Sequence, residues 1–223
     1  MANIRLIKRR IRVSKNIAQV TKAMQMVAAS KMKKAQEKAV SQKPYAQKIL
    51  ELVSQFSKGK EIDPVSYPFF KKNLGKKNLV ILVSTNKGLC GSLNSNLFRS
   101  LNDWFLKDAE TDFVTFGEKG RLLVLRFGKN LVADFSSSLF LNSVGALLNL
   151  IIEGYTKGIY KEVYLVYNNF LSILNHEPVR KLLLPLGEIL TEEKSAKDFL
   201  IEPDLKTVLL QLLPHYLEVE IRK

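Results

Sequence analysis

Residues 1–56 form the stretch that most constrains how this chain can fold. The stretch contains no glycine, and its single proline, Pro44, lies near its end. Apolar side chains recur in it at spacings of four and three residues, the pattern of an amphipathic or coiled-coil helix: Val13, Ile17, Val20, Met24 and Val27. Such a helix spans roughly 80 Å, whereas a compact domain of this size is only about 40 Å across. We therefore expect one long helix that projects from a domain or bends.

The same stretch carries most of the net charge of the protein. Residues 1–50 contain thirteen lysines and arginines but one acidic residue, Glu37, so they contribute +12 of the total of +14. A helix with so many like charges repels itself unless an acidic surface faces it. The charge indicates nucleic acid, an anionic membrane or an acidic protein surface as the partner, without choosing among them. A solvated lysine face is the remaining alternative.

Composition limits the class of protein further. With 223 residues and 46% hydrophobic side chains, the chain can form one or two domains with a real core. Cys90 is the only cysteine, which excludes a disulfide framework and a multi-cysteine metal site and favours a reducing compartment. No run of about eighteen apolar residues occurs, and the basic N-terminus lacks the apolar core of a secretory signal. We therefore expect a mature protein that does not span a membrane.

Beyond the long helix, strand and helix patterns alternate along the chain. We expect four parts: a long basic amphipathic helix over 1–58, a connector over 59–78, an α/β domain over 79–200 and a last helix over 201–223. Short apolar runs predict five strands: 79–83, 113–116, 130–135, 162–167 and 179–184. The helical or mixed segments between and after them are 95–107, 119–126, 143–155 capped by Ser143, and 205–220, which Pro214 should bend or break. The predicted fold class is α/β, a long coiled-coil-type helix plus a Rossmann-like domain of about five strands, with a polar loop at 187–198.

The turn after the first predicted strand is where a nucleotide phosphate would bind if this were a nucleotide enzyme. The turn covers residues 84–94 and contains Gly88 and Gly91. A phosphate-binding loop needs a lysine and a hydroxyl residue after its last glycine, and a dinucleotide site needs three spaced glycines; this turn has neither. The better interpretation is that the glycines allow a tight turn from strand to helix.

The sequence shows no catalytic constellation. Cys90 would be a nucleophile only with a histidine base beside it, and His176 and His215 are far away in the sequence. Two histidines without a carboxylate cluster make a poor metal site. We therefore predict no catalytic residue, no cofactor and no metal, and interpret the chain as a structural or interaction protein. A cysteine- or nucleotide-dependent enzyme is a lesser alternative.

Two sequence blocks resemble the gamma subunit of F-type ATP synthase. Residues 17–35 closely resemble the N-terminal helix of that family, and residues 84–94 resemble its central motif, in which Gly88, Cys90 and Gly91 hold matching positions. Three shorter matches follow in the order of the family: Lys43-Pro44-Tyr45, Leu183-Leu184-Pro185 and Glu202-Pro203. The resemblance covers essentially the whole chain, and its first block is highly specific.

The resemblance implies a rotor shaft in the central stalk. In the family, this helix pairs with a long C-terminal helix as a coiled coil inside the ring of alpha and beta subunits. The α/β domain meets the epsilon subunit and the c-ring in the membrane. Ion flow turns the shaft, and its torque drives ATP synthesis in the catalytic sector, CF(1), coupled to hydrogen ion transport. Five residues match shaft positions near the beta subunits: Arg9, Arg10, Lys22, Met24 and Lys31.

The resemblance also implies a non-catalytic subunit of a proton-transporting ATP synthase, with no cofactor and no nucleic-acid partner. We expect it to lie peripherally on the cytoplasmic side of a bacterial plasma membrane.

The family continues for several dozen residues after the helix that follows Glu202, whereas this chain ends at Lys223. We therefore expect a C-terminally truncated fragment or frameshifted copy; a truncated subunit that works with the N-terminal helix alone and a non-functional chain are the alternatives. Its N-terminal helix should be partly mobile or self-associate through residues 13–27.

The competing class is a basic-arm nucleic-acid-binding protein. Binding by such a protein would weaken steeply with salt, because several phosphates would be neutralised. Against this class, the predicted α/β domain lacks an aromatic-rich basic signature, and the small residues of the long helix favour helix pairing.

Overall fold

The computed structural model describes residues 2–58, 68–70, 72–107, 110–137, 140–172, 175–186 and 205–222. Residues 1–45, here called the arm unit, and residues 46–222, here called the sheet unit, form two compact units. Each unit is described by itself. Half of the predicted connector (59–67 and 71) and the predicted loop at 187–198 lie outside the described residues.

The arm unit consists of a helix. Helix α1 (Ala2–Lys58) contains Pro44 without ending there and continues into the sheet unit, as the lack of glycine predicts. Every side chain from Asn3 to Ala35 is exposed, although many of these side chains are apolar. In the predicted stripe, Met24 is 65% exposed and Val13 is 48% exposed. The stripe therefore has no cover within the described chain.

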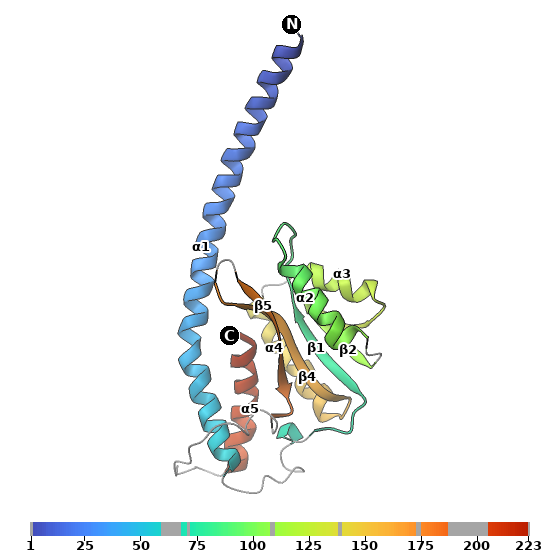
Figure 1. The fold of residues 1–223 in the computed structure, drawn as a ribbon. Helices are drawn as coiled ribbons and strands as arrows, with labels where there is room; N and C mark the ends of the chain where they lie inside the picture. The colour runs from blue at the N-terminus through green and yellow to red at the C-terminus, as the bar shows by residue number, and fades with distance from the viewer. Residues whose placement is uncertain are drawn as a thin grey trace. The chain divides into compact units, whose positions relative to one another are not determined.

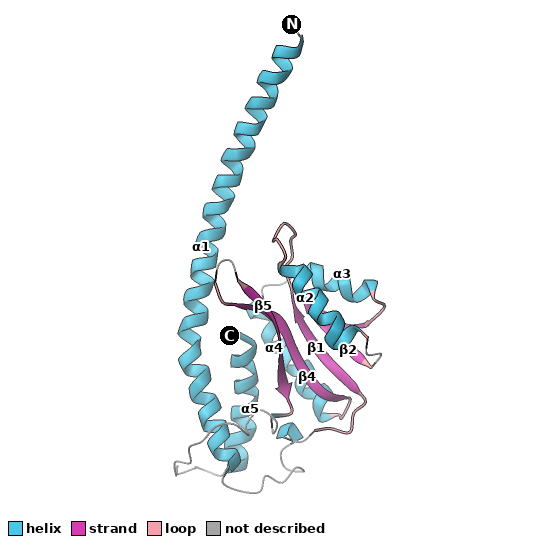
Figure 2. Ribbon diagram, in the orientation of Figure 1, coloured by secondary structure: helices cyan, strands magenta, loops and turns pink. Residues whose placement is uncertain are grey.

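Five strands build the sheet unit in the order β3-β2-β1-β4-β5. Their bounds are β1 (Lys77–Val83), β2 (Thr111–Phe116), β3 (Asn130–Asp134), β4 (Tyr160–Phe170) and β5 (His176–Leu184). Strands β1 to β4 are parallel, and β5 pairs antiparallel with β4. The order β3-β2-β1-β4 is that of a doubly wound nucleotide-binding half, so the predicted Rossmann-like class is confirmed. Figure 2 shows β1 and β4 side by side at the centre of the sheet.

Helices cover both faces of this sheet (Figure 1). On one face, α2 (Leu93–Leu101), the π-helical turn η2 (Asn102–Leu106) and α3 (Glu118–Arg126) form a core with inward residues such as Val80 and Leu82. On the other, α4 (Phe140–Thr156) and α5 (Leu205–Arg222) pack with the short η1 (Pro68–Phe70). Ile49 of α1 is 3% exposed in this second core. The end of the long helix and the last helix therefore belong to the sheet unit.

Three local expectations need correction or refinement. The helix predicted over 95–107 is present as α2 and η2, but from Asn102 it is π-helical, and this turn buries Phe105 and Leu106. Ser143 does not cap a helix, because α4 begins one turn earlier and Ser143 is 5% exposed within it. Pro214 does not break α5, which continues to Arg222. Burial of Tyr216 and the residues that follow outweighs the hydrogen bond that Pro214 cannot donate.

Candidate functional site

The exposed face of the arm unit combines apolar and basic side chains. On an α-helix, residues advance by about 100° each. Arg9, Arg10, Met24 and Lys31 therefore share an arc of about 100° with the apolar stripe, whereas Lys22 lies on the opposite side. All five side chains are exposed. A face of this kind fits a partner that offers apolar contacts together with carboxylates.

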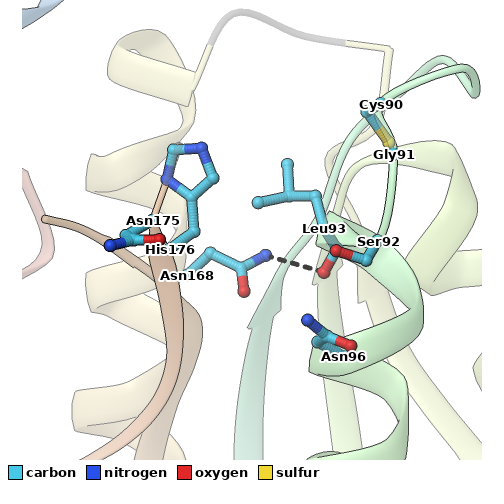
Figure 3. A pocket seen from close by; sticks show the side chains of 8 residues that line it. All are labelled: Cys90, Gly91, Ser92, Leu93, Asn96, Asn168, Asn175 and His176. Atoms are coloured by element: carbon cyan, nitrogen blue, oxygen red, sulfur yellow. Dashed lines mark hydrogen bonds between the residues drawn. The ribbon is translucent and has the colours of Figure 1, made fainter. Parts of the chain in front are cut away.

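A second candidate lies in the sheet unit, at the carboxyl ends of β1 and β4. The helix that follows β1, α2, lies on one face of the sheet, and the helix that precedes β4, α4, lies on the other. Ligands of open α/β sheets bind at this kind of switch point. A pocket of about 440 Å³ opens there (Figure 3). Eight residues line it: Cys90, Gly91, Ser92, Leu93, Asn96, Asn168, Asn175 and His176.

The glycine turn forms one wall of this pocket. Gly91 has a φ of 61°, in the left-handed region that glycine favours, and Leu89 adopts the same φ with its side chain fully exposed. Asn94 donates through Nδ2 to Thr85 Oγ1 at 2.7 Å and to Cys90 Sγ at 3.3 Å. These bonds tie the turn to the first turn of α2. The structure therefore agrees with a tight turn at Gly91, while Gly88 does not have a positive φ.

The structure brings Cys90 and His176 to one pocket, which their sequence separation did not indicate. His176 begins β5, and the pairing of β5 with β4 places it at the end of the sheet where the glycine turn lies. In Figure 3 the imidazole and Cys90 come from opposite walls. The hydrogen-bonding neighbours of the thiol are instead Asn94 and Thr85. The half-buried thiol of Cys90 is thus hydrogen-bonded within the glycine turn and the start of α2, and not to the imidazole of His176.

The other histidine lies elsewhere in the sheet unit. His215 is on α5, where Nδ1 lies 3.5 Å from Glu218 Oε2. Across the described ranges, no three histidine, cysteine or carboxylate side chains gather as metal ligands. None of the helices that the structure describes has the length and hydrophobicity needed to cross a membrane.

Comparison with known proteins identifies the family. The sequence model of the family described as ATP synthase matches residues 3–223. The ATP synthase gamma chain of Geotalea uraniireducens (strain Rf4) is 35% identical over 232 residues, which cover 100% of this chain and 79% of that protein. The gamma chain of Pasteurella multocida (strain Pm70) is 37% identical, over 99% of this chain and 80% of that protein. The chain belongs to the ATP synthase gamma chain family.

A solved structure supports the same assignment of this gamma-family chain. This chain resembles a chain in the cryo-EM structure of the central stalk and c-ring of the mitochondrial ATP synthase from Tetrahymena thermophila. The TM-score is 0.63 at 25% identity, and the match covers 91% of this chain and 89% of that chain. The resemblance found in the sequence is therefore confirmed. Nothing in these comparisons supports the nucleic-acid-binding alternative.

The glycine turn over 84–94 supplies four of the eight lining residues, but the sequence did not indicate the opposite wall of the pocket. Asn168, Asn175 and His176 come from the end of β4 and the start of β5, which are ordinary polar positions in the sequence. The order of the strands alone places them opposite the glycine turn. A rule about switch points could have indicated this only after the sheet order was known.

Proposed function

We propose that this chain is the central-stalk gamma subunit of an F-type ATP synthase. It transmits torque between the c-ring in the membrane and the catalytic alpha/beta hexamer during ATP synthesis coupled to proton transport. Membership of the gamma family and the likeness to a central-stalk chain support this function. The observation that carries it is the exposed helix from Asn3 to Ala35, because a stiff helix with a basic and apolar surface can push on surrounding subunits.

On this proposal, the arm unit supplies the contacts with other subunits. Arg9, Arg10, Met24 and Lys31 meet beta subunits beside the apolar stripe, and carboxylates of beta neutralise the basic side chains. Lys22 lies on the other side of the helix, where a ring that encloses the shaft also offers contacts. The stripe itself packs against a partner helix: Val13, Ile17, Val20, Met24 and Val27. Exposures of 48% to 65% in this stripe support an apolar partner.

The sheet unit, on the same proposal, joins the epsilon subunit and the c-ring. The protein then lies peripherally on the cytoplasmic side of a bacterial plasma membrane, since gamma chains from bacteria are among its relatives. The subunit uses no cofactor and binds no nucleic acid. The turn with Gly88, Cys90 and Gly91 has a structural role, because its bonds hold the start of α2 to the end of β1.

The test is co-elution of this chain with its cognate alpha and beta subunits, with ATP hydrolysis measured on the same fractions. Co-elution with raised hydrolysis is the expected result. Failure to co-elute, together with salt-sensitive binding to DNA, would overturn the proposal in favour of the nucleic-acid class.

Matched triple variants locate the contact on the arm. Arg9, Arg10 and Lys31 lie on the arc of the stripe, whereas Lys8, Lys15 and Lys33 lie on the opposite side of the helix. Replacing the first three by alanine should weaken association about tenfold, as the loss of three modest ion pairs predicts. The same change at the second three removes equal charge and should weaken association less. Equal losses would show that net charge, and not a defined face, holds the complex.

A further inference from the structure

A buried carboxylate joins the last helix to the edge of the sheet. Glu220 of α5 is 5% exposed, and its carboxylate forms an ion pair with the ammonium group of Lys181 on β5. Charged side chains are almost never this deeply buried without a partner. The side chain of Lys181 is 31% exposed, so the lysine reaches inward from the rim of the core.

Buried apolar and aromatic side chains lie near Glu220. Val219 and Ile221 beside it are buried, and so is Tyr216 one turn earlier. Burial and the negative charge of Glu220 together raise the pKa values of Tyr216 and of Tyr167 on β4. Both phenols therefore stay neutral near the carboxylate. Lys181 of β5 forms an ion pair with this carboxylate.

The apolar contacts of α5 do not by themselves fix its position along the sheet. Hydrophobic packing is non-directional, and a shift of α5 by four residues would place Leu212 and Leu213 where the buried Tyr216 and Leu217 lie, which keeps these two positions apolar. Such a shift, close to one helical turn, moves side chains by about 5.4 Å. It would separate Glu220 from Lys181 and break a buried ion pair, which is strongly unfavourable. The ion pair therefore selects one register.

This register matters for the base of the long helix. Ile49 of α1 and Phe69 of η1 belong to the same core cluster as Tyr216, Leu217 and Ile221 of α5. A core that holds its helices in one arrangement resists a twisting force better than one with several arrangements of similar energy. A fixed α5 therefore contributes to a stiff anchorage for the end of α1.

We propose that Lys181 and Glu220 are positioning residues for torque transmission: their buried ion pair fixes α5 in one register on β5 and so stiffens the core that anchors α1. The proposal rests on the proposed central-stalk function. It also makes a claim about the isolated chain, namely that the pair determines how tightly α5 is held.

Amide hydrogen exchange on the full isolated chain tests the register. Glu220→Gln and Lys181→Met should each raise exchange in residues 216–222 at least tenfold, and Lys181→Arg, which keeps the cation, should restore protection. The control is the exposed ion pair between Lys157, which directly follows α4, and Glu153 of α4, whose side chains are 61% and 65% exposed. Glu153→Gln and Lys157→Met should leave exchange unchanged. Unchanged protection of α5 in Glu220→Gln would overturn the proposal whatever the function of the chain.

Coupling in the assembled ATP synthase tests the role in torque. The readout is the ratio of ATP-driven proton pumping to ATP hydrolysis in vesicles that contain the whole complex. The single variants should lower this ratio by at least half while hydrolysis and co-elution persist. The double variant Lys181→Met/Glu220→Met should recover protein stability, because an apolar pair often replaces a buried ion pair without loss, but not the ratio.

Two outcomes separate the claims. A double variant with the wild-type ratio would show that the pair has a structural role only, and would overturn the proposal. A wild-type chain that fails to assemble with alpha and beta would instead overturn the central-stalk function. In that case the exchange experiment still decides whether the pair fixes the register of α5.

Discussion

Gly117 lies between β2 and α3, at a point where the backbone closely approaches the residue after β1. Its φ is 101°, which side chains rarely adopt, and a Cβ there would lie 2.2 Å from the carbonyl oxygen of Ser84. The hydroxyl of Ser84 in turn donates to Gly117 O at 3.1 Å and accepts from Gly120 N at 2.8 Å. The end of β1 and the start of α3 therefore meet too closely for any side chain at this position.

Gly117→Ala should lower the free energy of unfolding of the sheet unit by about 3 kcal/mol, because it adds backbone strain and a steric clash. Gly128→Ala is the control, since Gly128 has a φ of 62° and open space where a Cβ would lie. That change should cost only about 1 kcal/mol. Urea unfolding followed by circular dichroism measures both. Similar losses for the two variants would contradict the close approach at Gly117.

Thr111 and Thr115 of β2 form a second matched pair. Both are buried, but Thr115 Oγ1 donates to Asp134 Oδ1 at 2.8 Å, whereas Thr111 Oγ1 has no hydrogen-bond partner among the described residues. Thr115→Val should destabilise the protein by about 2 kcal/mol, the cost of a charge-assisted bond. Thr111→Val should be neutral or stabilise it by about 1 kcal/mol. A destabilising Thr111→Val would show that this hydroxyl has a partner.

Asp134 makes stability depend on pH. Burial raises the pKa of its carboxyl, but hydrogen bonds from Ser136 and Thr115 lower it more, so the pKa lies below its ordinary value of 3.8. A lowered pKa in the folded state contributes stability above the ordinary value, and this stability is lost as the pH falls through the folded pKa. Wild type should therefore lose stability between about pH 5 and about pH 2 more steeply than Asp134→Asn. Parallel urea titrations across this range measure the difference, and identical slopes would exclude the contribution of Asp134.

At the scale of elements, the long helix has two environments. Ile49 is 3% exposed in the core of the sheet unit, and Ile17 in the arm unit is 59% exposed. In the sequence, both residues are isoleucines within the same predicted helix. Burial therefore distinguishes a residue that supports folding from one available to a partner.

Ile49→Ala should lower the free energy of unfolding by about 3 kcal/mol, because it leaves a cavity in a packed core. Ile17→Ala should change it by less than about 0.5 kcal/mol. The order should reverse for co-elution with alpha and beta subunits, where Ile17→Ala lowers affinity several-fold through lost apolar contact. Wild-type affinity in Ile17→Ala would show that the stripe is not a contact surface.

The helices also show which structural features the sequence patterns predicted and which they missed. The apolar spacing predicted α1, and the lack of glycine in its fifty-seven residues supported a helix. It missed the early start of α4 at Phe140 and the passage of α5 through Pro214, because tertiary burial decides both. The π-helical turn at Asn102 adjusts side-chain direction within an otherwise regular helix, a detail that spacing alone does not encode.

At the scale of the whole molecule, the candidate surfaces differed in how well the sequence predicted them. The basic and apolar side chains of α1 are local in sequence, so the arm face followed from periodicity and charge. The switch-point pocket depends on β4 lying beside β1, a pairing of residues about eighty positions apart. Cys90 and His176 therefore line one pocket in a way that no local pattern indicates.

The measurement that most directly tests the central claim is rotation in a single complex. A bead is fixed to the sheet unit at Lys157→Cys, in a chain with Cys90→Ser so that no second thiol reacts, and the alpha and beta subunits are held on a surface. Torque transmission predicts that ATP turns the bead continuously in one direction. Steady ATP hydrolysis by the assembled complex with a bead that only fluctuates would contradict it.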